Sequence, residues 1–301
     1  MEIFKLKSRH DGLDISVLVM RPAGKVRSVL QIAHGMCGSK ERYISFMAYM
    51  ASHGVACVAH DHRGHGHSIL SSDDLGYMYG GGYEALIDDM RLVNEWIRAV
   101  FDDVPVYMLG HSMGSLALMA YMHRYPQDAD GVVLCGSPAY SPFSPFLYRV
   151  ASVLCWFGMG HMRPKLIYRI MTDYYNRDYD SEGMLAWICS DHEVRMTFIN
   201  DPLHNFRFTL NGSRALMGLM IEAYSHERFD PSLNDLPVLL ISGEDDSCSG
   251  GPAGIDKSAC AIHDRGCRNV RIKTYPAMRH EILNEKGKER VWQDICKFMQ
   301  V

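Results

Sequence analysis

The stretch VPVYMLGHSMGSLALMAYMHRYP, residues 104–126, decides the fold. Its first part, VPVYML, is typical of a buried strand, and the run from Met113 to Tyr125 is compatible with a helix that ends before Pro126. Between them stands GHSMG (110–114), which fits the pattern G-x-S-x-G. The tight turn of this pattern needs glycines at both ends, so that strand and helix can approach, and it exposes the central serine at the helix N-terminus. By itself the five-residue pattern also occurs by chance, but with a strand before it and a helix after it, it predicts that Ser112 is a nucleophile between the elbow glycines Gly110 and Gly114.

A serine hydroxyl is a weak nucleophile, so a base must lie within hydrogen-bond reach and a carboxylate must orient that base. Where this turn occurs, the chain order is serine, acid, histidine. Downstream, an apolar strand runs into GEDD (243–246), and the last predicted strand is followed by His280. The order fits Ser112, Asp246 and His280, although the residues alone leave Glu244 and Asp245 as alternative acids.

The oxyanion that forms on attack needs preorganised N–H donors. One donor is expected from the backbone of Met113, the residue after the nucleophile. The other is expected from the loop HGMCG (34–38), whose glycines let the backbone turn its amides inward, and Met36 is the predicted donor. The alternative for this loop is an ordinary turn between a strand and a helix.

Short apolar segments alternate with longer helical ones over most of the chain. Segments 3–7 and 15–20 flank Asp11-Gly12 and are expected to pair as a hairpin. The later strands are uninterrupted apolar runs, which are typical of a mainly parallel sheet covered by helices on both faces. The predicted strands after the hairpin are 29–33, 55–59, 104–109, 132–135, 238–241 and 270–275, and the clearest helix is 83–100.

The alternation stops between about residues 138 and 233, where proline-interrupted aromatic segments and helical runs such as 213–224 take its place. We interpret this part as a helical insertion over the carboxyl ends of the strands, where α/β folds bind ligands. The expected division is a core of residues 1–137 and 234–301, and a helical cap or lid of residues 138–233 that includes the returning helix.

Composition narrows the classes of protein. The 47% apolar and 22% charged content is that of a globular protein, and the net charge of −4 gives no reason to expect a nucleic-acid partner. Nine scattered cysteines argue against a disulfide framework. The N-terminus lacks the apolar region of a signal peptide, and no uncharged apolar run reaches the length of about 18 residues that a membrane span needs. We therefore expect a cytoplasmic protein without a transmembrane segment.

Four histidines lie within HDHRGHGH (60–67), a density that suggests metal ligands. The spacing partly resembles the zinc motif of metallo-β-lactamase-like hydrolases, but Gly64 stands where that motif has an aspartate. The alternative is a glycine-rich turn after a parallel strand, capped by Asp61 and braced by Arg63. We expect this second arrangement, with no metal and no cofactor.

In combination, these stretches resemble the monoacylglycerol lipase, lysophospholipase and serine-aminopeptidase branch of the α/β-hydrolases. The resemblance runs from about residue 28 to the C-terminus and implies the α/β-hydrolase fold, with a mostly parallel central sheet, helices on both faces and a helical cap. The similar segments are HGMCGSKERY (34–43), DHRGHGHS (61–68), GHSMGS (110–115), NDPL (200–203), GEDD (243–246) and RHEILNE (279–285).

The resemblance also implies roles for single residues. Ser112 corresponds to the nucleophile, His280 to the base, and Met36 and Met113 to the oxyanion donors. Asp246, the third residue after a glycine, corresponds to the acid. Segment 61–64 corresponds to a structural turn. The loop after the acid, SCSGG (247–251), is richer in glycine and serine than the family pattern.

The insertion bears on the substrate. Its first helical run carries an apolar stripe, which either lines an acyl tunnel or touches a lipid surface, or else packs on a small core of the cap itself. The stripe consists of Phe143, Phe146, Leu147, Val150, Val153, Leu154 and Phe157. An aminopeptidase would instead need carboxylates near the site to bind a substrate amine. The acidic candidates in the insertion are Asp173, Asp178, Glu182, Asp191 and Glu193.

The expected function is therefore hydrolysis of a carboxylic ester, a monoacylglycerol or a related small acyl ester, through an acyl-enzyme on Ser112. The alternatives are a serine aminopeptidase, a metal hydrolase that uses the histidines of 60–67, and a non-catalytic binding module on the same fold. The expected partner is a small acyl-ester or lipid substrate, with transient membrane contact through the cap. The oligomeric state is left open.

Overall fold

One eight-stranded sheet forms the centre of the computed structural model, which describes residues 1–225 and 230–301, with backbone only at 166, 167, 170 and 171. Its strands are β1 (Glu2–Lys7), β2 (Asp14–Met20), β3 (Ser28–Ala33), β4 (Val55–His60), β5 (Val106–His111), β6 (Gly131–Cys135), β7 (Val238–Gly243) and β8 (Val270–Tyr275). The order across the sheet is β1-β2-β4-β3-β5-β6-β7-β8. The β1–β2 and β2–β4 pairs are antiparallel and all later pairs are parallel. The predicted fold class is confirmed.

Each predicted strand is present, with small differences at the ends. β5 begins at Val106 rather than at 104, because Pro105 has no N–H to donate to the ladder, and it continues to His111 at the turn. The hairpin of β1 and β2 is confirmed, but its connection is longer than a two-residue turn, since Lys7 pairs with Asp14. Within that connection Asp11 accepts a hydrogen bond from the Leu13 N–H at 3.2 Å.

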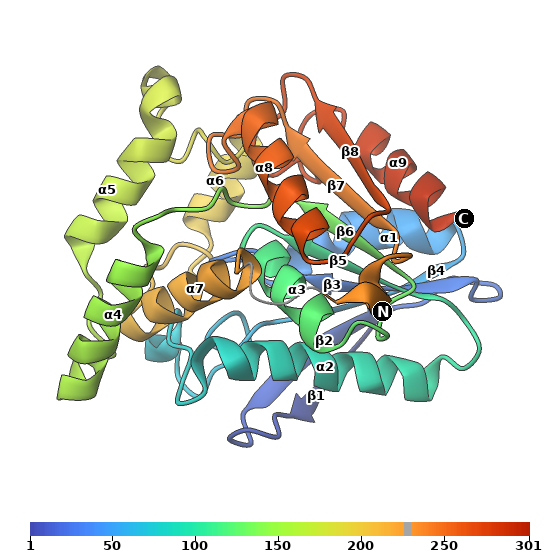
Figure 1. Ribbon diagram of the computed structural model, residues 1–301, viewed down its shortest axis with the longest axis horizontal. Helices are drawn as coiled ribbons and strands as arrows, with labels where there is room; N and C mark the ends of the chain where they lie inside the picture. Colours follow the sequence, from blue (N-terminus) through green and yellow to red (C-terminus); the bar gives the residue numbers. More distant parts are fainter. Residues whose placement is uncertain (226–229) are drawn as a thin grey trace.

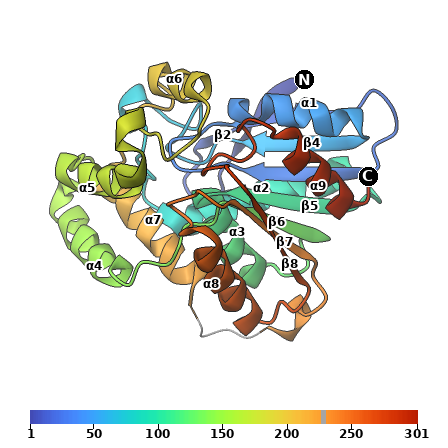
Figure 2. The same cartoon turned by 90° about the horizontal axis from the view of Figure 1, so that it is seen from above.

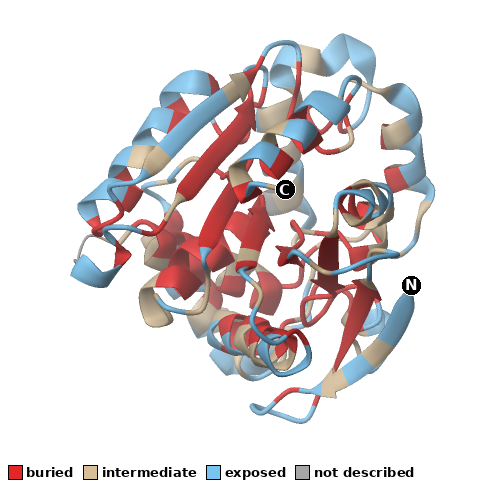
Figure 3. Ribbon diagram, turned by 90° about the vertical axis from the view of Figure 1, so that its right-hand side faces the viewer, coloured by how far each residue is buried: buried red, intermediate tan, exposed pale blue. Residues whose placement is uncertain are grey.

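Helices cover both faces of the sheet (Figures 1 and 2). On one face lie α1 (Ile44–Ser52) and α9 (Glu289–Met299), whose buried residues form an apolar cluster with β3, β4 and β7. On the other face lie α2 (Gly82–Val100), α3 (Met113–Arg124) and α8 (Gly251–Asp264). Figure 3 shows the inner strands of the sheet buried between these layers, while the edge strands β1 and β8 and the outward faces of the helices are largely exposed.

Between β6 and β7 the described residues form helices and no strand. These helices are α4 (Ser144–Leu154), α5 (Lys165–Asn176), α6 (His192–Asn200) and α7 (Leu210–Ala223), with a π turn at Cys155–Met159 and a short helix at Arg177–Glu182. Helix α7 contacts α4 on one side and the core helices α2 and α3 on the other. Figure 1 shows the group at one end of the molecule, beside the sheet.

Helix α7 begins three residues earlier than predicted. The Thr209 hydroxyl accepts a hydrogen bond from the Gly212 N–H at 3.0 Å and so caps the helix. Gly212 is kept inside the helix because a side chain there would overlap the carbonyl of Gly76. Within the described residues, no helix combines the length and the apolar character needed to cross a membrane.

Candidate active site

Ser112 stands at the turn between β5 and α3, with φ 54° and ψ −119°. A non-glycine residue adopts this left-handed conformation only when its surroundings impose it. Here the crossing of strand and helix does so, because a side chain on Gly110 would overlap the Gly114 carbonyl, and one on Gly114 would overlap the Ala33 carbonyl. The glycine spacing therefore positions Ser112 as the sequence predicts.

The structure brings Ser112, His280 and Asp246 into one hydrogen-bonded chain, although they lie far apart in sequence. The distance between His280 Nε2 and Ser112 Oγ is 2.8 Å. His280 Nδ1 lies 3.0 Å from Asp246 Oδ2 and 3.1 Å from Oδ1. Because the carboxylate can only accept, Nδ1 carries the hydrogen and Nε2 is free to accept the serine proton. This is the arrangement of a nucleophile, a base and a group that orients the base.

Among the three adjacent acids, the geometry selects Asp246. Its side chain is buried and accepts hydrogen bonds from the N–H groups of Cys248 at 2.9 Å and Ser249 at 3.2 Å. Glu244 and Asp245 are exposed, and Glu244 accepts a hydrogen bond from the Thr274 hydroxyl at 2.9 Å.

The insertion contacts the backbone on both sides of Asp246. The Tyr179 hydroxyl donates to the Asp245 carbonyl at 2.6 Å, and the Ser247 hydroxyl donates to the Tyr175 carbonyl at 2.7 Å. The loop that carries the acid is therefore bound to the insertion as well as to the sheet.

Asp246 and His280 each shift the pKa of the other toward its charged form. Burial acts to raise the pKa of the Asp246 carboxyl, but His280 and the two backbone donors lower it further, so that the net shift is downward. Burial acts to lower the pKa of the His280 imidazole, but the Asp246 carboxylate outweighs it and the net shift is upward. Asp246 is thus held as an anion, and the imidazolium form of His280 is stabilised beside it.

Two backbone N–H groups in the Ser112 region have no hydrogen-bond acceptor in the part of the chain that the structure describes. Neither Met36 nor Met113 donates its N–H to any described residue, and both residues line the same cavity as Ser112. The loop of Met36 is fixed from behind, since the Gly35 carbonyl accepts from the Gly38 N–H at 3.0 Å and lies 2.7 Å from His34 Nδ1. These two donors are the ones predicted to hold an oxyanion.

Ser112 opens into a cavity of about 750 Å³, within the range of small-molecule sites, which we call the Ser112 cavity. His280 and Met113 lie in its floor, and residues of the insertion form most of its remaining walls. Those walls are largely apolar and include Tyr140, Phe143, Leu147, Tyr175, Trp187, Leu216, Met217 and Met220.

A family model described as "Serine aminopeptidase, S33" matches residues 24–287 of the 301-residue chain. The chain belongs to this family. The match covers the turn of Ser112, the whole insertion, and the loops of Asp246 and His280, so the resemblance seen in the motifs extends over most of this S33 hydrolase.

Curated relatives and solved structures agree with this assignment. The S33 hydrolase is 28% identical to the monoacylglycerol lipase of Mycolicibacterium smegmatis over 294 residues, which is 96% of this chain and 93% of the relative. It is 26% identical to the monoglyceride lipase of Rattus norvegicus, over 91% of this chain and 86% of the relative. These similarities make the chain a carboxylic ester hydrolase of the monoacylglycerol lipase type.

Its fold is close to that of a thermostable carboxyl esterase from Bacillus coagulans, solved with glycerol. The TM-score is 0.89 at 24% identity, over 99% of this chain and 97% of the other. A monoglyceride lipase from Saccharomyces cerevisiae, solved with a substrate analogue, gives a TM-score of 0.74 at 20% identity, over 99% and 94%. At these identities the likeness establishes the fold.

Several residues that shape the site carry no sequence signal. The ring of His111 lies 4.9 Å from the ring of His280, and its Nε2 donates to the His280 carbonyl at 3.2 Å. From the insertion, Trp187 packs on His280 with ring centroids 5.1 Å apart. The contacts of His111 and Trp187 with His280 join segments that are distant in the chain, so local patterns do not predict them. For His111, its place inside the GHSMG motif is the only indication that it lies near the site.

A buried ion pair follows the base directly. Glu281 Oε2 lies 3.0 Å from the Arg42 guanidinium, and both side chains are almost fully enclosed. Burial acts to raise the pKa of the Glu281 carboxyl, but Arg42, with His111 and Asn284, outweighs burial and holds that pKa well below its usual range. Both residues lie within segments quoted for the family resemblance, but the sequence alone does not show that they pair.

The histidine-rich segment 60–67 forms a braced turn in the S33 hydrolase. Asp61 accepts from the Lys40 Nζ at 2.6 Å and from the His67 N–H at 2.8 Å. Arg63 pairs with Asp89 at 2.8 Å. Among residues 1–225 and 230–301, no three metal-ligand side chains converge on one point, and the predicted bracing by Asp61 and Arg63 is present.

The apolar stripe of the insertion is not packed into a core of its own. Phe143 and Leu147 line the mouth of the Ser112 cavity and are themselves exposed, and Phe146, Val150, Val153 and Phe157 are exposed without lining it. Helix α4 instead buries Ser144 and Ala151, the face toward α7. These contacts favour a stripe that lines the cavity and leaves its outer face uncovered, over a stripe that packs on a small core of the cap.

None of the five acidic candidates of the insertion lines the Ser112 cavity. Asp173 pairs with Arg169 at 3.4 Å and Asp178 with Arg177 at 3.5 Å. Glu182 pairs with Arg279 at 2.5 Å, and Asp191 accepts from the Glu193 N–H at 2.9 Å as a helix cap. The side chains of Asp173, Asp178, Glu182 and Asp191 thus interact on the surface or between segments, outside the cavity.

Proposed function

We propose that this chain hydrolyses monoacylglycerols or related small acyl esters through an acyl-enzyme on Ser112. The observation that carries the proposal is the chain of hydrogen bonds from Ser112 through His280 to Asp246 at the floor of an apolar cavity. A hydroxyl so placed can be deprotonated as it attacks, and apolar walls suit an acyl chain.

In the first half of the reaction, His280 Nε2 takes the Ser112 proton as Oγ attacks the ester carbonyl. The carbonyl oxygen becomes an oxyanion, which the N–H groups of Met36 and Met113 stabilise. When the tetrahedral intermediate collapses, the bond to the alcohol breaks, and the proton on His280 passes to the leaving oxygen. Asp246 fixes the tautomer of His280 and stabilises its protonated form throughout.

In the second half, a water molecule replaces the alcohol. His280 takes a proton from this water, the resulting hydroxide adds to the acyl carbon, and collapse returns the proton to Ser112 Oγ while the carboxylic acid departs. Both halves of the reaction use the same groups, namely Ser112, His280, Asp246 and the N–H groups of Met36 and Met113.

The Ser112 cavity favours an ester over an aminoacyl amide. A substrate with a free amine needs a carboxylate to bind its charge. Within the described residues, Glu281 is the one aspartate or glutamate side chain that lines the cavity, and Arg42 already neutralises it at 3.0 Å. The aminopeptidase alternative thus has no support from the charges of the cavity, although the family model bears that name.

We further propose that residues 138–233 act as a cap that touches lipid surfaces transiently. The outer face of α4 and the following turn exposes large apolar side chains, among them Trp156 with 81% of its surface accessible. Such side chains can enter the interfacial layer of a membrane and bring the cavity to its substrate. Binding to lipid vesicles that is unaffected by changing Phe146 and Trp156 together to serine would contradict this part of the proposal.

The test is hydrolysis of glycerol monoesters with acyl chains of increasing length, with Ser112→Ala as the blank. We expect activity to peak at medium or long chains and to fall on the order of 10⁶-fold in Ser112→Ala. Ser52→Ala, at an exposed serine on α1, is the matched control and should keep full activity. A Ser112→Ala enzyme with near-normal turnover would refute the mechanism, and would direct attention to chelator sensitivity.

Two further outcomes separate the remaining alternatives. A covalent adduct of an organophosphonate on Ser112 excludes a non-catalytic binding module, since only an activated nucleophile reacts with it. Turnover of aminoacyl anilides together with no turnover of any glycerol ester would favour the aminopeptidase alternative.

A further inference from the structure

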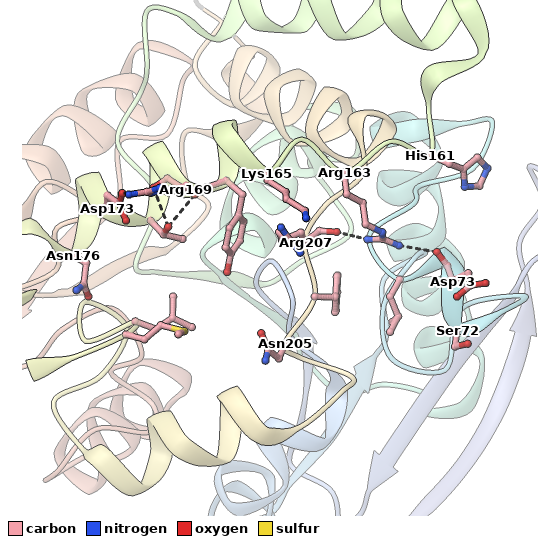
Figure 4. A pocket seen from close by; sticks show the side chains of 16 residues that line it. Ser72, Asp73, His161, Arg163, Lys165, Arg169, Asp173, Asn176, Asn205 and Arg207 are labelled. Atoms are coloured by element: carbon pink, nitrogen blue, oxygen red, sulfur yellow. Dashed lines mark hydrogen bonds and ion pairs between the residues drawn. The ribbon is translucent and has the colours of Figure 1, made fainter.

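A second cavity of about 1200 Å³ lies beside the Ser112 cavity, between helix α5, the segment 205–207 and the short helix Ser72–Asp74. We call it the basic cavity. Figure 4 shows its lining, with the Lys165 and Arg207 side chains directed into the same space. The mechanism proposed above uses none of these residues.

The basic cavity carries more positive than negative charge. Besides His161, its lining contains the basic side chains Arg163, Lys165, Arg169 and Arg207 and the acidic side chains Asp73 and Asp173. Arg169 is neutralised by Asp173 at 3.4 Å. The Arg163 guanidinium donates to the backbone carbonyls of Arg207 and Asp73, and it pairs with no carboxylate among the described residues.

Lys165 and Arg207 have no counter-ion. Their side chains form no hydrogen bond and no ion pair with any residue that the structure describes, and Arg207 is half-buried. A guanidinium that is partly removed from water and left without an acceptor is a favourable partner for an anion, because charge-assisted hydrogen bonds are strong. Together with Arg163, which donates to backbone carbonyls, they place three cations without a described carboxylate partner in one cavity.

The two cavities share a wall. Tyr168, Thr172, Leu185, Asn205 and Phe206 line both of them. The wall meets the predicted oxyanion loop directly, since the Cys37 thiol lies 3.3 Å from the Phe206 carbonyl.

The cations act across this wall. Burial raises the pKa of the Cys37 thiol, and the charge of Arg163 opposes that shift. Burial likewise raises the pKa of the Tyr168 phenol, against the charge of Arg207. The basic groups are therefore close enough to influence groups at the edge of the Ser112 cavity.

The two ends of an ester would meet different surfaces. From Ser112, the side formed by α4 and α7 offers Leu147, Leu216 and Met220, which suit an acyl chain. The side with Tyr168 and Phe206 borders the basic cavity. If the acyl chain occupies the apolar side, the alcohol part of the ester extends toward the cations.

We propose that the basic cavity binds an anionic group, a phosphate or a carboxylate, carried by the alcohol part of the acyl ester that Ser112 cleaves. The inference rests on the proposed function and narrows its substrate class from neutral glycerol esters to esters of an anionic alcohol. Arg207 and Lys165 bind the anion and so determine specificity, while the groups at Ser112 carry out the reaction.

The first test compares three esters with the same acyl chain: a 1-acylglycerol, a 1-acylglycerol 3-phosphate and an acyl ester of glyceric acid. We expect kcat/KM to be higher for one or both anionic esters, and which of them is preferred identifies the anion. In the double variant Lys165→Gln/Arg207→Gln, the anionic esters should lose about tenfold or more in kcat/KM, while the neutral ester stays within about twofold. The preference should also weaken as salt is added.

Arg149→Gln is the matched control, since Arg149 is an exposed cation on α4 that does not line the basic cavity. It should leave all three esters unchanged. Equal kcat/KM for the three esters in the unaltered enzyme, or an equal loss for all of them in the double variant, would overturn the inference. In that case Ser112-dependent hydrolysis of the neutral ester would still uphold the proposed function.

The second test does not depend on turnover. Calorimetric titration of the Ser112→Ala protein with each of the two anionic esters should show binding of at least one that weakens about tenfold when Lys165→Gln and Arg207→Gln are added. Unchanged affinity in that protein would overturn the inference. This readout remains valid if no ester is hydrolysed, an outcome that would count against the proposed function alone.

Discussion

The indole of Trp187 lies against the imidazole of His280, with ring centroids 5.1 Å apart and planes inclined at 44°. One ring belongs to the helical insertion and the other to the loop after the last strand. The contact covers one side of the proposed base with an apolar surface. The position of the insertion and the orientation of the base are therefore coupled.

We expect Trp187→Ala to lower kcat/KM for ester hydrolysis by about 10- to 100-fold, because a small displacement of the base impairs proton transfer. Trp187→Phe keeps an aromatic ring at the contact and should recover most of the activity. The measurement is steady-state kinetics on one glycerol ester, with circular dichroism to show that the fold is retained. Full activity in a folded Trp187→Ala enzyme would show that the contact does not orient His280.

The pH dependence of the reaction follows from His280, which must be neutral to accept the serine proton. Its pKa is raised by Asp246 above the ordinary histidine value of about 6.5. Activity should therefore be low in acid and rise with pH, with the midpoint of kcat/KM above about 6.5. A midpoint below about 6 in the unaltered enzyme would contradict the assignment.

Asp246→Asn provides the matching control for that profile. The substitution removes the charge that does most to raise the pKa of His280, and burial, opposed only by the charge of Glu281, then acts to lower it. We expect the midpoint to move to lower pH and kcat to fall by about 10⁴-fold, since the orienting carboxylate is lost. Glu244→Gln, at an exposed neighbouring acid, should change neither quantity.

The buried pair of Glu281 and Arg42 should be costly to break from one side. Glu281→Gln leaves the Arg42 guanidinium buried without a counter-ion, and we expect the free energy of unfolding to fall by about 3–5 kcal/mol. The double variant Glu281→Gln/Arg42→Met removes the unpaired charge and should recover most of that loss. Urea denaturation monitored by tryptophan fluorescence measures both, and an equal loss in the double variant would show that the pair stabilises the protein in some other way.

The same pair predicts the acid sensitivity of the fold. The pKa of Glu281 is lower in the folded protein than the value of about 4.3 for an unfolded chain. Its contribution to stability is therefore fully present above that unfolded value and is lost as pH falls toward the folded pKa. The Glu281→Gln variant should show a weaker decline in stability between pH 5 and pH 3 than the unaltered protein, where the pH limits are about those of carboxyl titration.

The elbow can be tested through Gly114. An alanine there would place Cβ against the carbonyls of Ala33 and His34, which belong to the backbone and cannot move aside easily. We expect Gly114→Ala to reduce the free energy of unfolding by about 3 kcal/mol and to abolish most activity, because strand and helix must separate. Gly24→Ala, where a side chain would meet no atom within 4 Å, is the control and should leave both unchanged.

The fold could be predicted from the sequence because it depends on local patterns in a fixed order, and the same order proposed Ser112 and His280, which the structure brings together. Uninterrupted apolar runs identified the strands, and the glycine spacing identified the turn of Ser112. The choice among Glu244, Asp245 and Asp246 rested on the family resemblance, since three adjacent acids differ only in which of them the fold buries. In the structure Asp246 is buried to 1% exposure while its two neighbours remain exposed.

Other features could not be predicted because they arise between segments that are remote in sequence. Trp187 reaches His280 only after the insertion has folded over the core, and Arg207 and Lys165 meet in one cavity only because α5 passes over segment 205–207. The helical period of the stripe at 143–157 predicted an amphipathic helix. That period cannot tell whether the apolar side is covered, and most of it is not.

The hydrogen bonds of Tyr179 and Ser247 on either side of Asp246 also limit how the enzyme can be recombined or diversified. The helical insertion is long and lies at one end of the molecule, which would suggest that it can be exchanged among related enzymes as an independent module. Since the acid loop is attached to it by two hydrogen bonds, a transplanted insertion would arrive without these attachments unless it brought a hydroxyl donor for the Asp245 carbonyl and an acceptor for Ser247. An exchange of the insertion between related enzymes should therefore include the loop at 245–247.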